Sequence, residues 1–159
     1  MSPRERPFAP EDLDWLVAEH QVHYARSDGF DDSFGALVRE VAQGFLDRGR
    51  EPRETGIVLE DEGTRLGTIF VAEHASGAAQ LRLFYLADAA RGRGFGYRLL
   101  RQAEAFASRA GYTRMLLWTH ESHTAAGRLY QSAGWRLVSS EPVHHFGAGM
   151  VVQHWERSL

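Results

Sequence analysis

The chain has 159 residues, a net charge of −3 at pH 7 and 43% hydrophobic residues, with no cysteine. This length suits one domain with its own core, so we expect a single domain over residues 1–159. The lack of cysteine excludes disulfides, thiol nucleophiles and thiolate-bound metals. No apolar run approaches the ~20 residues of a membrane-spanning helix, and the N-terminus is too polar for a signal peptide. The weak charge favours neither nucleic acid nor an anionic membrane as partner, and we expect a cytoplasmic protein.

The first third of the chain predicts one strand and two helices. Residues 4–8 can form a short edge strand. Apolar side chains recur at helical spacing over residues 11–26. An acidic or serine cap at residues 31–33 begins a second helix, which ends near Gly49.

The middle of the chain has the period of strands. Residues 56–62 and 65–73 predict a hairpin around the turn Asp61-Glu62-Gly63. Residues 81–86 form a third apolar, strand-like run. We therefore expect an antiparallel meander of three strands.

A helix over residues 97–110 follows, with Gly111 at its C-terminal stop. Residues 114–119 are apolar without alternation, which indicates a strand buried on both faces. Strand, helix and strand in this order form a right-handed crossover, so we expect this strand to run parallel to residues 81–86.

The last part predicts a short helix over residues 123–133 and two paired strands, 135–139 and 151–155. The loop between these strands would hold His144 and His145. The predicted fold class is α/β (α+β): a mixed, mostly antiparallel sheet of six or seven strands with two helices on each face.

The most informative stretch is the turn Arg91-Gly92-Arg93-Gly94-Phe95-Gly96, between a strand and a helix. Glycines let the backbone approach a ligand closely, and the first amides of a helix have no internal partner. The helix dipole and two arginines add positive charge there. The spacing is not the dinucleotide pattern G-x-G-x-x-G, and a chain without lysine has no nucleotide P-loop. The turn therefore predicts a different phosphate site.

Its pattern, R-x-x-G-x-G, resembles the pyrophosphate loop of the GNAT superfamily of acetyl-CoA-dependent N-acyltransferases. Gly111-Tyr112 resembles the way this family closes the helix after that loop. The segment from Ala126 to Trp135 looks like the family's A-x-x-L-Y-x-x-x-G-F motif. The element order resembles the GNAT fold over nearly the whole chain.

A narrower resemblance concerns one subfamily. The segment from His20 to Phe45, with Leu117-Trp118-Thr119 and His145-Phe146-Gly147, is similar to the acetyltransferase half of bacterial fusions of a MarR-type regulator to a GNAT domain. The regulator half has no counterpart in this sequence.

The resemblance implies acetyl-CoA as the cofactor. Loop amides would bind its pyrophosphate, while the end of the preceding strand would bind the pantetheine arm and polarise the thioester carbonyl. These cofactor-binding positions are Phe84, Tyr85, Leu86, Arg91, Gly92, Arg93, Gly94, Phe95, Gly96 and Tyr97.

The family's catalytic tyrosine corresponds to Tyr130. A phenol, with a reference pKa of about 10, can give a proton to the thiolate leaving group and recover it. The alternative is that Tyr130 only packs on the buried face of its helix and ties off its hydroxyl.

The sequence departs from the family pattern at two places. His123 stands where the family has Asn, so it either replaces the hydrogen bond to the cofactor arm or is only the first residue of the helix. No acidic residue lies in residues 81–86, where many members keep a general base. The open candidates for that base are water and the following side chains: His120, Glu121, Glu19, His20 and His23.

The eight histidines do not predict a metal site, because none pairs at i, i+4 with a carboxylate as in H-E-x-x-H. The sequence thus favours an N-acetyltransferase that acts on a primary amine, in a small molecule or a peptide, by direct attack. The alternative is a non-catalytic sensor of acyl-CoA. The acceptor pocket would be lined by Tyr24, Phe34, Trp118 and His145, and a homodimer stays open.

Overall fold

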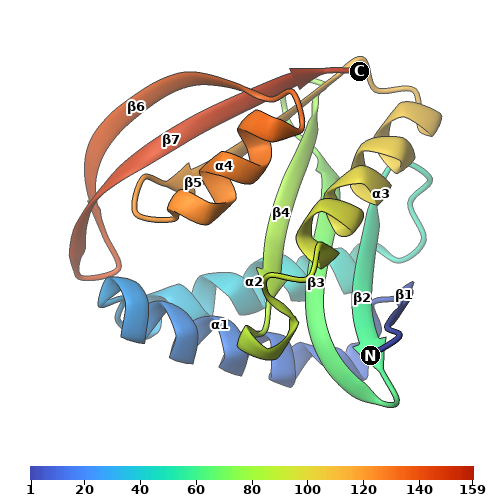
Figure 1. Cartoon of the computed structure of the whole chain (residues 1–159), viewed down its shortest axis with the longest axis horizontal. Coiled ribbons are helices and arrows are strands. Elements are labelled where there is room, and N and C mark those ends of the chain that lie inside the picture. The colour runs from blue at the N-terminus through green and yellow to red at the C-terminus, as the bar shows by residue number, and fades with distance from the viewer.

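The computed structural model describes all residues from 1 to 159 and shows one seven-stranded sheet with helices on both faces (Figure 1). The strand order is β1-β2-β3-β4-β5-β7-β6, and only β4 and β5 are parallel neighbours. The predicted fold class is confirmed. No helix is both long and apolar enough to cross a membrane. The elements are β1 (Arg4–Pro7), α1 (Leu13–Asp28), α2 (Asp32–Arg48), β2 (Thr55–Asp61), β3 (Thr64–Glu73), β4 (Ala79–Leu86), α3 (Phe95–Arg109), β5 (Arg114–His120), α4 (Thr124–Ser132), β6 (Arg136–His145) and β7 (Ala148–Ser158).

The ends of the first two helices follow from local chemistry. Gly29 takes a left-handed conformation, φ 73°, and ends α1. The Asp31 carboxylate accepts a hydrogen bond from the Ser33 amide at 3.0 Å and caps α2. Both signals were readable in the sequence. Helix α3, in contrast, begins at Phe95 rather than at Tyr97, because the left-handed Gly94 already occupies its N-cap position.

The sheet buries a core on each face because neighbouring residues of a strand point to opposite sides. Val58 faces α1 and α2, in a cluster with Leu16 and Val38. Leu59, the next residue of β2, belongs to the larger cluster on the other face, with Leu99 of α3 and side chains of α4. Two helices therefore cover each face, as predicted.

The sheet is split in its middle. Strands β4 and β5 pair only at Ala79 with Met115 and at Gln80 with Leu116, and then diverge (Figure 1). Beyond that point the facing edges of the two strands lack each other as hydrogen-bond partners. This split lies at the β4 end that leads into the glycine loop, so it places free main-chain groups beside the predicted phosphate site.

A bulge bends β4 just before the loop. The register with β3 shifts so that Tyr85 faces Thr68 while Arg82 faces Phe70, and Leu83 adopts φ 46°. The Thr68 hydroxyl donates to the Leu83 carbonyl at 2.8 Å and fixes the distortion. Bulges of this kind re-aim a strand and are common next to functional sites.

Two predictions about the C-terminal half are wrong. The last strands are longer than expected, so His144 and His145 lie in β6 and the turn consists of Phe146 and Gly147, with φ 55° and 75°. Strand β5 is not buried on both faces, because Trp118 is 42% exposed, between the rings of His74 and His154.

Candidate active site

The glycine loop presents unpaired main-chain donors to solvent. None of the N–H groups of residues 92–97 donates a hydrogen bond within the protein, and the first bond of α3 runs from the Arg98 amide to the Gly94 carbonyl at 3.1 Å. These donors lie at the positive end of the helix dipole. The arrangement can bind an anion.

The three glycines of this loop have different roles. Gly92 and Gly94 have φ of 71° and 82°, a conformation that other residues rarely adopt, and the space around them is open. A Cβ on Gly96 would lie 3.4 Å from a methyl group of Leu86 and 3.5 Å from one of Leu129. The first two glycines therefore shape the loop, while a Cβ on the third would make only ordinary contacts with β4 and α4.

The two loop arginines also differ. Arg93 is exposed and has no partner within the protein. Arg91 is not the mobile charge that the sequence suggested: its Nε donates to the Leu86 carbonyl at 2.9 Å, and its Nη2 lies 3.3 Å from His23 Nε2. Arg91 thus fastens the loop to the end of β4 and brings positive charge to the side of α1.

The end of β4 supplies the free edge. The Ala87 amide donates to the Leu66 carbonyl at 2.8 Å. Because main-chain groups alternate along an antiparallel pair, the N–H and C=O of Tyr85 point toward β3 and those of Leu86 point away from it. Of the three predicted residues, Phe84 and Leu86 therefore turn their main-chain groups to the split in the sheet, where the Leu86 carbonyl already accepts Arg91 Nε and the Leu86 amide is free. The Tyr85 side chain instead faces α1, where its hydroxyl donates to Glu19 Oε2 at 2.8 Å.

Tyr130 lies on α4 with its ring buried, at 4% exposure, 5.8 Å from the rings of Trp135 and Trp155. Its hydroxyl makes no hydrogen bond within the protein, so the packing alternative lacks the tied-off hydroxyl that it requires. Burial, followed by the nearby Tyr24, raises the pKa of Tyr130 above its ordinary value. The phenol is therefore protonated at neutral pH and has a donor to spare.

An aromatic cluster forms where five elements meet: the ends of α1 and β5, the starts of α2 and α4, and the tip of the β6–β7 hairpin. Neighbouring rings lie 4.9–5.3 Å apart. The Asp31 amide holds the hairpin tip by donating to the Phe146 carbonyl at 2.8 Å. We call this set the aromatic cluster: Tyr24, Phe30, Phe34, His120, His123 and Phe146.

Three of the four side chains predicted to line the acceptor pocket are near this cluster. Tyr24 and Phe34 belong to it, and His145 lies beside Phe146 with ring centres 5.8 Å apart. Trp118 does not, because it points to the uncovered outer face of β5. That part of the prediction is wrong.

One carboxylate reaches the cluster, and the sequence analysis did not select it. Asp28, the last residue of α1, lies with Oδ2 2.8 Å from His123 Nε2 and accepts a hydrogen bond from the Ser122 hydroxyl at 2.9 Å. One carboxylate oxygen of Asp28 and one ring nitrogen each of His120 and His123 lie within 4.8 Å of one another. The sequence showed Asp28 only as a helix end, because its partners are more than ninety residues away.

The remaining candidates for a general base are differently placed. His20 is 2% exposed with Nδ1 bonded to the Leu16 carbonyl, and burial lowers its pKa to about 4. Burial also lowers the pKa of His120 to about 4, and its Nδ1 has no partner. The Glu19 carboxylate already accepts the Tyr85 hydroxyl, and Glu121 is exposed.

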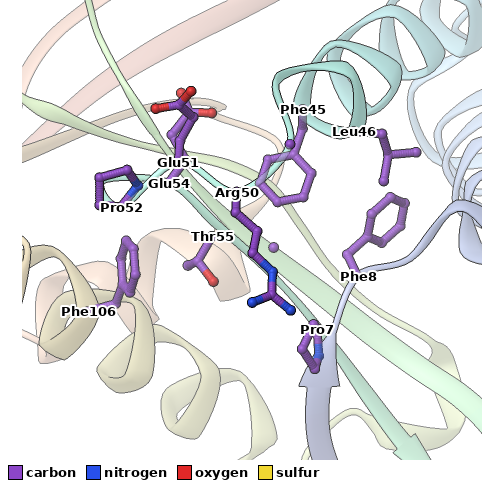
Figure 2. Close-up of a pocket in the computed structure, with 12 residues that line it drawn as sticks. Pro7, Phe8, Phe45, Leu46, Arg50, Glu51, Pro52, Glu54, Thr55 and Phe106 are labelled. Atoms are coloured by element: carbon purple, nitrogen blue, oxygen red, sulfur yellow. The ribbon is translucent and has the colours of Figure 1, made fainter.

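One hollow in the surface lies away from this site. An open groove of about 520 Å³ lies between the end of α2, β1, β2 and α3, with Phe45, Phe8 and Phe106 in its walls (Figure 2). Of its charged side chains, Arg50 and Glu51 are exposed, while Glu54 is only 12% exposed and pairs with Arg48 at 2.8 Å. The groove contains none of the predicted site residues.

Comparison with known proteins places the chain. Residues 13–135 match the acetyltransferase (GNAT) family. An uncharacterized N-acetyltransferase of Schizosaccharomyces pombe is 30% identical over 141 residues, which cover 86% of this chain and 82% of that protein.

Solved structures agree with this match. A GCN5-related N-acetyltransferase from Kribbella flavida is 26% identical, with a TM-score of 0.77 over 99% of this chain and 98% of its own. The protein yncA of Salmonella typhimurium, solved with its cofactor acetyl-CoA, is 17% identical, with a TM-score of 0.75 over 100% of this chain and 95% of its own. The second likeness concerns the fold alone.

Proposed function

The chain belongs to the acetyltransferase (GNAT) family, and we propose that it transfers the acetyl group of acetyl-CoA to a primary amine. The observation that carries the proposal is the run of free amides at residues 92–97, beside the split between β4 and β5. A pyrophosphate bound by these amides would let the pantetheine arm enter the split. The relative of the same fold that holds acetyl-CoA supports this choice of cofactor.

The amides would replace water around the two phosphate groups, at about 1.5–3 kcal/mol for each charge-assisted bond. Arg93 is free to add a full charge, while Arg91 keeps the loop in place. The free edge at Phe84 and Leu86 would bind the pantetheine amides, and an N–H of that edge would polarise the thioester carbonyl.

The reaction then needs one bond formed and one broken. The amine nitrogen attacks the thioester carbonyl carbon and forms the C–N bond. The C–S bond then breaks, which leaves the amide and the thiolate of coenzyme A. Tyr130 gives its proton to the departing thiolate and takes one from the new amide nitrogen. Its unpaired, protonated hydroxyl supports this role.

The acceptor would enter from the side of the aromatic cluster. Its rings suit a small amine with an apolar body or an exposed peptide amine, and Asp28 adds a negative charge that favours a cationic acceptor. We further propose, from the sequence, that the chain is a single domain, that it is cytoplasmic, that it binds no nucleic acid and that it is similar to MarR–GNAT fusions. A homodimer remains an alternative to a monomer.

The competing function is a sensor that binds acyl-CoA without turnover. Mixing the protein with acetyl-CoA and a panel of primary amines, including polyamines, arylalkylamines and peptides with a free N-terminus, separates the two. We expect release of free thiol, detected by a chromogenic disulfide, with at least one amine. Tight binding of acetyl-CoA by calorimetry with no thiol released on any amine would support the sensor.

A further inference from the structure

His123 is held by a hydrogen bond that joins distant parts of the chain. The residue occupies the N-cap position of α4, and its Nε2 lies 2.8 Å from Asp28 Oδ2 at the end of α1. Both side chains are largely shielded, with 20% and 10% of their surfaces exposed. The contact therefore fixes the imidazole ring at the wall of the aromatic cluster.

We propose that His123, positioned by Asp28, is the general base that takes the proton from the acceptor ammonium. This inference rests on the proposed acetyltransferase function. In it, His123 is the catalytic residue and Asp28 is a positioning residue. It replaces the predicted role of His123 in binding the cofactor arm.

The hydrogen bond decides which nitrogen acts. An ionised carboxylate only accepts hydrogen bonds, so Nε2 must carry the hydrogen and Nδ1 must carry the free lone pair. Burial alone would raise the pKa of Asp28, but the hydrogen bonds from His123 and Ser122 outweigh it and hold the pKa below its ordinary value. Asp28 is therefore ionised at neutral pH, and Nδ1 has no partner within the protein.

The position suits the reaction. The His123 ring lies 5.2 Å from the ring of Tyr24, and Tyr24 is close enough to Tyr130 to affect its pKa. His123 is the N-cap of α4, and Tyr130 follows seven residues later on the same helix, so the two side chains share one helix face about two turns apart. Tyr130 serves the leaving thiolate, and His123 serves the incoming amine.

Other titratable and charged groups also surround the His123 ring. Asp28 and Tyr24 face it from α1, and His120 faces it from β5 at 5.0 Å between ring centres. His23, with Arg91 beside it, lies further along α1, and His145 approaches His120 from the hairpin. Asp28 is the only carboxylate that hydrogen-bonds the ring.

The proton balance closes. The ammonium gives one proton to His123 Nδ1 and becomes a neutral amine, which attacks the thioester carbonyl. The second proton passes from the amide nitrogen to sulfur through Tyr130. His123 then releases its proton to solvent, so the products are an amide, a free thiol and one proton.

The test compares pH profiles of kcat/KM for the amine, in buffers with EDTA so that no bound metal contributes. For His123→Gln we expect a loss of about 10²–10⁴-fold at pH 7, with the affinity for acetyl-CoA unchanged. The loss should shrink as the pH rises and the amine deprotonates in solution. Added imidazole should restore part of the rate in His123→Ala.

Asp28→Asn isolates the positioning role. Removing the carboxylate removes the acceptor that holds the hydrogen on Nε2, so kcat should fall and the preference for the Nε2–H tautomer should be lost, with the affinity for acetyl-CoA unchanged. His154→Gln is the matched control, because His154 also lies near a carboxylate, Glu141 at 3.9 Å, but on the outer face. It should leave the profile unchanged.

Independently of turnover, long-range ¹H–¹⁵N NMR should show His123 with its hydrogen on Nε2 in the wild type. A Nδ1–H tautomer, an unchanged kcat in Asp28→Asn, or a loss in His123→Gln matched by weaker acetyl-CoA binding would each overturn the proposal. A wild type that turns over no amine would instead reject the acetyltransferase function, and the base with it.

Discussion

Three tyrosines have buried side chains, and only one of them leaves its hydroxyl without a hydrogen bond in the protein. Tyr85 donates to Glu19, and Tyr112 donates to the Arg53 carbonyl at 2.9 Å. Tyr130 is as buried as these two but bonds to nothing in the protein. Of the three, only the Tyr130 hydroxyl is therefore free to bond a ligand.

At this scale we predict the effect of Tyr130→Phe. The change removes only an unpaired hydroxyl, so the melting temperature should not fall and acetyl-CoA should bind as before. The turnover number should drop by about 10²–10⁴-fold, because the thiolate loses its proton donor. Stopped assays of thiol release, with calorimetry for the cofactor, measure both effects.

Tyr112→Phe is the matched control. It removes a hydroxyl that is hydrogen-bonded far from the loop, so it should lower stability by about 1 kcal/mol and leave turnover intact. If Tyr130→Phe behaved like this control, Tyr130 would be a packing residue.

At the scale of elements, one helix start and one split between strands define the site. Helix α3 can expose its first amides because left-handed Gly94 occupies the N-cap without offering a capping side chain. Strands β4 and β5 can part because α3 and α4 pack on the same face and keep the larger core closed beneath them. Neither element would bind the cofactor alone.

We predict that Gly94→Glu abolishes cofactor capture. A carboxylate at this position faces the phosphates and repels them, so the Kd for coenzyme A should rise at least about 100-fold, the loss of one or two charge-assisted bonds. Gly94→Ala carries the same left-handed strain without the charge and serves as the control. Equal affinities of the two variants in calorimetry would contradict the phosphate role of this loop.

At the scale of the molecule, a buried acid joins the N-terminal segment to the sheet. Asp12 is fully buried. Its carboxylate accepts hydrogen bonds from both Nη atoms of Arg6 at 2.8 Å and from Nε of Arg65, on β3, at 2.7 Å. Burial raises the pKa of this carboxyl, but the two guanidinium groups outweigh it and bring the pKa to about 2. These hydrogen bonds thus join β1 and the start of α1 to β3.

This network predicts a dependence of stability on acid. The folded pKa of Asp12 lies below the ordinary value of 3.8, so its contribution is present above pH 4 and is lost as the pH falls toward 2. The contribution amounts to about 2 kcal/mol. Asp12→Asn should destabilise the fold by about 3–5 kcal/mol at neutral pH and flatten the stability curve between pH 4 and pH 2.

Urea unfolding at several pH values, followed by circular dichroism, measures this slope. Asp14→Asn is the control, since the Asp14–Arg39 pair is exposed and should contribute nothing measurable. A wild-type slope retained in Asp12→Asn would show that another carboxylate controls the acid response.

Much of this molecule was determined by local sequence. Asp31 and Gly29 mark helix ends through their own caps, and alternation along residues 56–73 predicts the hairpin of β2 and β3. The glycine loop and the motif around Tyr130 were recognisable because their chemistry lies in a few adjacent residues. Caps, turns and motifs need no distant partner, so they can be read along the chain.

The rest depended on residues far apart in sequence. Trp118 lies in an unbroken apolar run that predicts burial on both faces, and only the fold shows that it is 42% exposed, between His74 and His154. Asp28 looked like the end of a helix, and only the fold brought it to His123, ninety-five positions later. The bulge at Leu83 and the parting of β4 from β5 arise from pairing between strands. The sequence by itself determined the family and the phosphate loop, whereas tertiary contacts decided which side chains meet in the acceptor site, because such meetings are set by the packing of whole elements.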